Sequence, residues 1–244
     1  MGPSVSIRFR GLLLRVPLMT PILFWVVVTG VTSHLQHTFP TRIAVALSAG
    51  CTILLVVALH EVVRVYAYRK LGVRVRGLDL LLIGSAPRLT EKLNRPRTEV
   101  TAGLAGMVSI ATIATGFFAV RQRLPVNSPV HGYFNVTGIA LVGIASIQIL
   151  PALPLDGGRL FRALVWHLSD DPVRGSRGAA VYGHIISAAM IGGGAILLIQ
   201  PGMWPYWGLG LLVAGLQIIF VTAASVRDTF CQRQGESLPL GGLL

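Results

Sequence analysis

The sequence predicts an all-α, polytopic membrane protein with about six transmembrane helices. Of its 244 residues, 53% are hydrophobic and only 12% are charged. The mean hydropathy is +0.69, which is too apolar for an ordinary soluble domain. Several stretches carry about 20 largely uncharged residues, the length that a helix needs to cross a bilayer core of roughly 30 Å. They are centred on residues 17–32, 43–63, 101–120, 134–153, 178–199 and 205–224.

The first of these stretches follows a short basic segment. Arg8, Arg10 and Arg15 precede the apolar run 17–32, an order that also occurs in secretory signals. No small-residue cleavage site closes the run convincingly. We therefore expect a retained first span.

The formal charge of +12 is best interpreted as topology, because basic residues of membrane proteins gather in cytoplasmic loops. With the N-terminus inside, 17 of the 21 Lys and Arg residues fall on the cytoplasmic side and three fall outside. Arg64 lies at the end of the second span. This split predicts a multi-pass protein of the cell membrane with both termini cytoplasmic. Lipids are its expected surroundings, and no nucleic-acid partner is expected.

The longest polar interval separates the second and third spans. It begins with Val73-Arg74-Val75-Arg76, which alternates with the period of a strand, and later contains the turn-forming Gly84-Ser85-Ala86-Pro87. We expect a short β-hairpin here, at the cytoplasmic membrane surface. An irregular basic loop lying on anionic lipid is the alternative.

The fourth span is interrupted near its cytoplasmic end by Pro151 and Pro154. Broken helix at membrane depth is tolerated where it is buried in protein or lines a cavity. We expect a single transmembrane domain over residues 1–244, with its core at 43–228 and a short cytoplasmic tail at 229–244.

Two carboxylates indicate where function resides. Of nine acidic residues, only Glu61 and Asp156 are expected in or against a span, where a charge is costly and by default functional. The second and fourth spans both run from outside to inside in the predicted topology. The two carboxylates therefore arrive at the same side of the bilayer.

Residues 60–64 read His60-Glu61-Val62-Val63-Arg64. This is the HExxH pattern of zinc proteases with the final His replaced; in the full pattern the two His bind zinc and the Glu activates water. Alone the fragment is weak, because a His-Glu pair at a helix end is more often a solvated polar step.

Together with the tract 71–89, the third-span pair Ala105-Gly106 and the segment 151–159, which ends Leu-Asp-Gly-Gly-Arg, this fragment resembles the site-2 protease family of intramembrane zinc metalloproteases. The resemblance implies a transmembrane protein as substrate or client and one zinc ion. It implies that His60 and Asp156 are metal ligands and that Glu61 is the general base.

The chain departs from the family pattern at two positions. Arg64 stands where the second His ligand belongs, and a guanidinium offers no lone pair to a metal. Gln148 stands where the family usually has Asn, at a position that the resemblance assigns to holding substrate. His184 in the fifth span is a replacement ligand to consider, although a lone intramembrane His is more often a hydrogen-bonded core residue.

Arg64 has two alternative roles on sequence grounds. It lies three residues after Glu61 on the same helix face, so it can pair with the buried carboxylates in place of a metal. Its expected position at the helix end also allows it to extend toward the cytoplasmic interface with the basic residues that follow.

These observations leave three functions open. The first is an intramembrane metalloprotease that cleaves transmembrane segments of membrane proteins. The second is an inactive pseudoprotease that binds such proteins, because Arg64 replaces a zinc ligand. The third, a transporter, is expected to show paired broken helices in two related halves, and only one broken span is evident.

Overall fold

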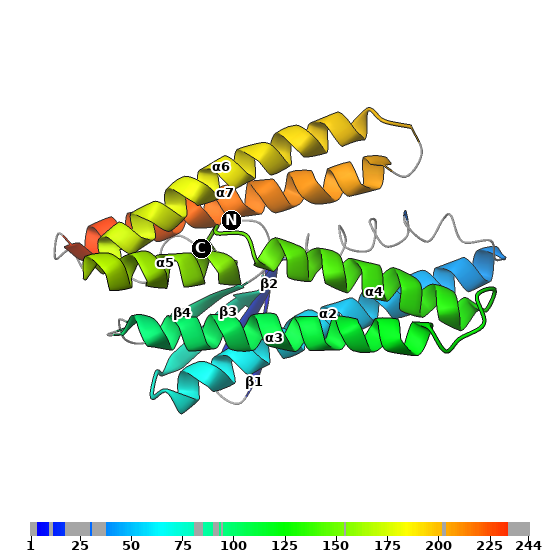
Figure 1. Ribbon diagram of the computed structural model, residues 1–244, viewed down its shortest axis with the longest axis horizontal. Helices are drawn as coiled ribbons and strands as arrows, with labels where there is room; N and C mark the ends of the chain where they lie inside the picture. The colour runs from blue at the N-terminus through cyan, green and yellow to red at the C-terminus, as the bar shows by residue number, and fades with distance from the viewer. Residues whose placement is uncertain are drawn as a thin grey trace.

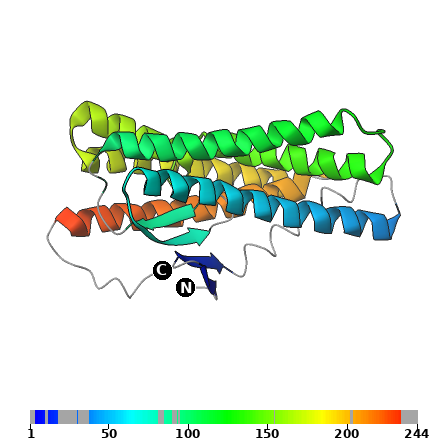
Figure 2. The same ribbon diagram turned by 90° about the horizontal axis from the view of Figure 1, so that it is seen from below.

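The computed structural model describes residues 4–9, 12–17, 30, 38–80, 85–89, 93, 95–153, 155–201 and 204–233. Long helices run side by side, and a small sheet lies against one side of them (Figures 1 and 2). The helices are α2 (Phe39–Lys70), α3 (Pro96–Arg121), α4 (Pro129–Gln148), α5 (Asp156–Ser169), α6 (Pro172–Leu198) and α7 (Trp204–Arg233).

Four of the described helices, α2, α3, α4 and α6, are long and apolar enough to cross a membrane. Helix α7 contains a shorter apolar stretch, Trp207–Phe220, and continues to Arg233, into the predicted tail. The predicted span 17–32 lies almost entirely outside the described residues. The count of six spans therefore stays a prediction.

A four-stranded sheet accompanies the helices, in the order β1 (Ser4–Phe9), β2 (Leu12–Pro17), β3 (Val75–Leu80) and β4 (Ser85–Leu89). Strands β3 and β4 pair antiparallel in the interval between α2 and α3, and their place at a membrane surface stays a prediction. Strands β1 and β2 also pair antiparallel, and β2 runs parallel to β3.

The expected all-α class is therefore wrong near the N-terminus, where β1 and β2 form a second pair of strands. Residues 4–10 read Ser-Val-Ser-Ile-Arg-Phe-Arg, an alternation of polar and apolar residues that is typical of a strand. This alternation was visible in the sequence, but the three arginines of the region were interpreted only as a sign of membrane topology.

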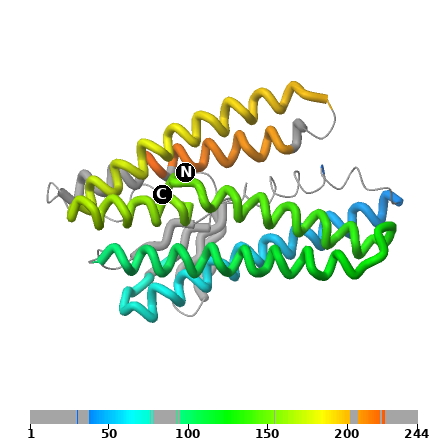
Figure 3. Tube along the Cα trace, in the orientation of Figure 1, coloured from blue at the N-terminus to red at the C-terminus, as the bar shows by residue number. Residues whose placement is uncertain are grey.

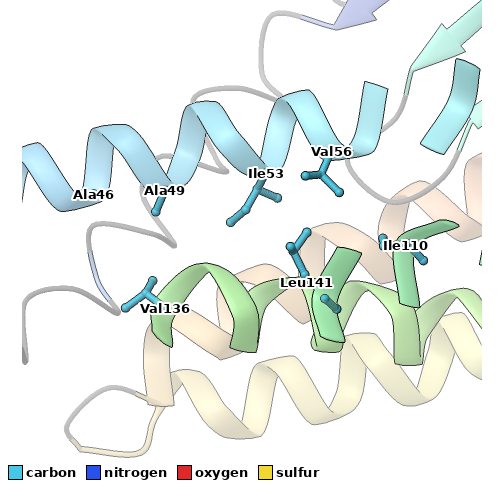
Figure 4. Close-up of a cluster of buried hydrophobic side chains, with 8 residues drawn as sticks. Ala46, Ala49, Ile53, Val56, Ile110, Val136 and Leu141 are labelled. Carbon is cyan, nitrogen blue, oxygen red and sulfur yellow. The ribbon is translucent and has the colours of Figure 1, made fainter. Parts of the chain in front are cut away.

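The first part of the core joins α2, α3 and α4 (Figure 4). Small and β-branched side chains of α2, among them Ala49 and Ile53, face Ile110 of α3 and Leu141 of α4, and each of these four is at most 1% exposed. Small residues let helix backbones approach closely, which favours association in lipid. A second cluster joins α6 and α7 to the segment that follows α4.

Between these two groups lies α5, which packs against α3 on one side and α6 on the other (Figures 1 and 3). Helix α5 was not predicted, because a search for long apolar runs misses a helix of 14 residues that carries two arginines. The predicted break in the fourth span is confirmed: α4 ends at Gln148 and helical structure resumes only at Asp156.

Candidate functional site

Helices α2 and α5 bring together the side chains that the sequence singled out. His60, Glu61 and Arg64 lie on α2, and Asp156 is the first residue of α5. All four are at most 1% exposed. The prediction that Glu61 and Asp156 meet across almost a hundred residues of sequence is met in the geometry, since both contact the same Arg64 side chain.

A backbone carbonyl fixes the orientation of His60. Its Nδ1 lies 2.9 Å from the carbonyl oxygen of Gly106 on α3, and the Ser109 hydroxyl donates to the same oxygen at 2.7 Å. A carbonyl only accepts hydrogen bonds, so Nδ1 carries the hydrogen. The other ring nitrogen, Nε2, consequently faces Asp156 Oδ2 at 3.2 Å and Glu61 Oε1 at 3.7 Å.

Arg64 lies inside this cluster and pairs with both carboxylates. Its Nη1 donates to Asp156 Oδ1 at 2.8 Å, and its Nη2 lies 3.3 Å from Glu61 Oε2. Of the two roles that the sequence left open for Arg64, the structure shows the pairing with Glu61 and Asp156. Helix α2 continues to Lys70, so Arg64 lies well inside the helix rather than at its end.

Glycine at 106 allows α3 to pass close to this cluster. A Cβ at that position would lie 2.7 Å from Asp156 Oδ2, 2.8 Å from His60 Cε1 and 3.0 Å from Arg64 Cδ. Only a residue without a side chain leaves space for these three groups. The Ala105-Gly106 pair noted in the sequence thus contributes space for the site and a carbonyl acceptor.

Gln148, the last residue of α4, is 2% exposed and lies beside the same site. Its Oε1 accepts a long hydrogen bond of 3.4 Å from the backbone N–H of Asp156. The amide therefore serves the start of α5, where the first backbone N–H groups of a helix need acceptors. Its assigned role in holding substrate stays a prediction.

The residues present do not fit a catalytic zinc ion. His60 Nε2 and Asp156 Oδ2 are 3.2 Å apart, close to the separation of about 3.4 Å expected for two ligands of one tetrahedral zinc. A catalytic site usually has three protein ligands, however, and the third position holds a guanidinium that is positively charged and has no lone pair. Among the described residues, no three His, Cys, Asp or Glu side chains are grouped to hold a metal.

His184 does not complete the set. It lies on α6 with its side chain exposed, and its Nδ1 is 2.7 Å from the carbonyl of Ala180 in its own helix. Of the described residues that the sequence singled out as metal ligands, His60 and Asp156 are therefore the two that lie together.

Glu99 is a third buried carboxylate that was not predicted from the sequence. Only Glu61 and Asp156 were expected in or against a span, because the apolar run of the third span begins at 101. Helix α3 begins at Pro96, and Glu99 in its first turn is fully buried. Its carboxylate pairs with Arg162 of α5, whose Nε donates at 2.9 Å.

Replacing Arg162 with methionine is expected to lower the free energy of unfolding by up to about 3 kcal/mol, because Glu99 then remains buried without its counter-charge. Thermal unfolding of the detergent-solubilised chain measures this change. Adding Glu99→Gln should recover part of the loss. An Arg162→Met variant as stable as the parent would contradict the ion pair.

Helices able to span a membrane thus bury a His and a Glu from within α2 beside an Asp at the start of α5, and known proteins share this architecture. A solved structure of the site-2 protease from Methanocaldococcus jannaschii has this fold. It matches 99% of this chain and 100% of its own, with a TM-score of 0.70 and 19% sequence identity.

Curated relatives are named as zinc metalloproteases. Rip3 of Mycobacterium tuberculosis, named as a candidate zinc metalloprotease, is 27% identical over 88% of this chain and 54% of its own length. The zinc metalloprotease MJ0392 of Methanocaldococcus jannaschii is 28% identical over 60% of this chain and 41% of its own. No family model matches the sequence. The chain is similar in fold to a solved site-2 protease and in sequence to these zinc metalloproteases, and it is an integral membrane protein.

The chain spans about half the length of the curated relatives that it matches, such as 54% of Rip3 and 43% of the Synechocystis protein sll0528. The structural comparison therefore supplies the fold. Activity, zinc content and partners have to be argued from this chain's own residues.

Proposed function

We propose that this protein binds transmembrane segments of other membrane proteins, and that the site formed by α2 and α5 does not hydrolyse them. One observation carries the second half of the proposal: the Arg64 guanidinium contacts Glu61 and Asp156 where hydrolysis would need a metal and an activated water. The likeness in fold to a site-2 protease and the helices able to span a membrane support membrane-protein partners.

The chemistry of Glu61 supports this conclusion. A general base must have an oxygen free to accept the proton of water. Here Oε1 and Oε2 of Glu61 both lie 3.3 Å from a nitrogen of Arg64. Arginine keeps its proton in proteins, so it cannot act as the acid or the base. The site is therefore chemically suited to holding charge.

Hydrolysis of transmembrane segments is the second candidate. The observation that favours it is the orientation of His60, whose Nε2 faces Asp156 at a separation suited to two ligands of one ion. We place the protein in the cell membrane with both termini cytoplasmic in either case, surrounded by lipids and without a nucleic-acid partner.

Reconstitution of the full chain with single-span model proteins carrying a photo-crosslinker separates the two candidates. The expected result is saturable crosslinking with no cleavage product, in the parent and in Glu61→Gln alike. Products that form with the parent and disappear in Glu61→Gln would establish hydrolysis instead. Neither crosslinks nor products would refute membrane-segment binding.

A further inference from the structure

The most unusual feature of the site is a fully buried cation that the chain carries itself. Arg64 is 1% exposed and lies one helical turn after His60. From α2 it contacts the first residue of α5, with its Nη1 2.8 Å from Asp156 Oδ1.

Two buried carboxylates require such a counter-charge. Removing a carboxylate from water costs several kcal/mol unless an opposite charge and hydrogen bonds replace the lost solvent. The planar guanidinium presents several N–H donors in a fixed arrangement, so one side chain can serve two carboxylates at once. Its contacts of 2.8 Å to Asp156 and 3.3 Å to Glu61 are of this kind.

A metal ion and Arg64 are alternatives for this place. An ion on His60 and Asp156 would lie close to the guanidinium, and the two positive charges would repel at low dielectric. The Cβ that Gly106 lacks would already meet Asp156, His60 and Arg64 within 3.0 Å, which shows how closely these groups fill the space next to α3.

We infer that Arg64 is the resident cation of this site: its guanidinium replaces the metal of the family, holds Glu61 and Asp156 together across α2 and α5, and makes the site independent of zinc. The inference deepens the proposed function and rests on it in one respect: both concern the same residues.

A single substitution should reverse the replacement. Arg64→His places His at i and i+4 of α2, on one face of the helix, opposite Asp156. With His60, the variant has three protein ligands, the usual number at a catalytic zinc. Arg64→Lys keeps a cation with less geometric fit, and Arg64→Met keeps side-chain length while removing the charge.

The test is the zinc content of the purified full chain after incubation with zinc and desalting, with His60→Ala as the background. The parent should hold no more zinc than His60→Ala. Arg64→His should hold about one ion per chain and lose it when His60→Ala is added. About one zinc per parent chain, lost in His60→Ala, would overturn the inference.

Thermal unfolding keeps the inference testable if Arg64→His fails to fold. The parent's unfolding temperature should not change with zinc or chelator, and it should fall in Arg64→Met and fall less in Arg64→Lys. An Arg64→Met variant as stable as the parent would show that the carboxylates need no resident cation. Neither readout involves a client protein, so failure here is distinct from failure of membrane-segment binding.

Discussion

An alanine at position 157 is expected to destabilise the chain by more than about 4 kcal/mol, enough to prevent recovery of folded protein. Gly157 follows Asp156 in the first turn of α5. A Cβ there would overlap the carbonyl of Ile149 and lie 2.6 Å from the oxygen of Leu150. Both are backbone atoms of the turn between α4 and α5, so they cannot move aside as a flexible side chain could. Yield of monodisperse protein and thermal unfolding measure the effect.

Gly143 provides the matched control. It also lies in a helix, α4, but a Cβ at 143 would meet nothing within 4 Å. Gly143→Ala should leave the free energy of unfolding within about 1 kcal/mol of the parent, because only helix propensity changes. Equal stability of Gly157→Ala and Gly143→Ala would mean that α5 does not approach the turn as closely as the structure places it.

The meeting of Glu61 and Asp156 could be predicted from the sequence because membrane topology limits where charges can lie. Two apolar spans of the same direction end at the same side of the bilayer, so residues near those ends are neighbours in depth. Pro151 and Pro154, near the cytoplasmic end of the fourth span, similarly predicted a break in the helix before Asp156. These inferences need only hydropathy, charge and the geometry of a helix.

The partner of Arg64 could not be predicted, because spacing alone allows both pairing and extension to the interface. The apolar run ends at 63, which places Arg64 at the edge of a span. The helix itself continues to Lys70, and this extension keeps the guanidinium within the protein. Its burial then follows from α5, a helix too short and too charged to be found by hydropathy.

Glu99 was missed for a similar reason, because helix α3 also extends beyond its apolar run, here at the N-terminal end. A hydropathy window starts a span where apolar residues begin, whereas the helix begins at Pro96, which suits the first turn because it needs no N–H there. A proline followed three residues later by a carboxylate was therefore the available signal. The need for a counter-charge, met by Arg162, becomes visible only when α5 is placed.

Replacing Asp156 with alanine is expected to lower the free energy of unfolding by about 3–5 kcal/mol, because the substitution removes a carboxylate that compensates the buried charge of Arg64. Arg64 would lose its 2.8 Å hydrogen bond to Asp156, whereas its 3.3 Å contacts with Glu61 would remain. His60 Nε2 would lose its neighbour at 3.2 Å as well. Thermal and denaturant unfolding in one detergent give the change.

A double-mutant cycle decides whether this loss belongs to the ion pair. In Asp156→Ala combined with Arg64→Met, the uncompensated charge is gone, so the double variant should be more stable than the sum of the two single losses predicts by at least about 1 kcal/mol. Asp156→Asn, which keeps an oxygen acceptor at nearly the same shape, should fall between the parent and Asp156→Ala. Strict additivity would mean that Arg64 and Asp156 do not stabilise one another, and the contact between α2 and α5 would then have to rest on apolar packing alone.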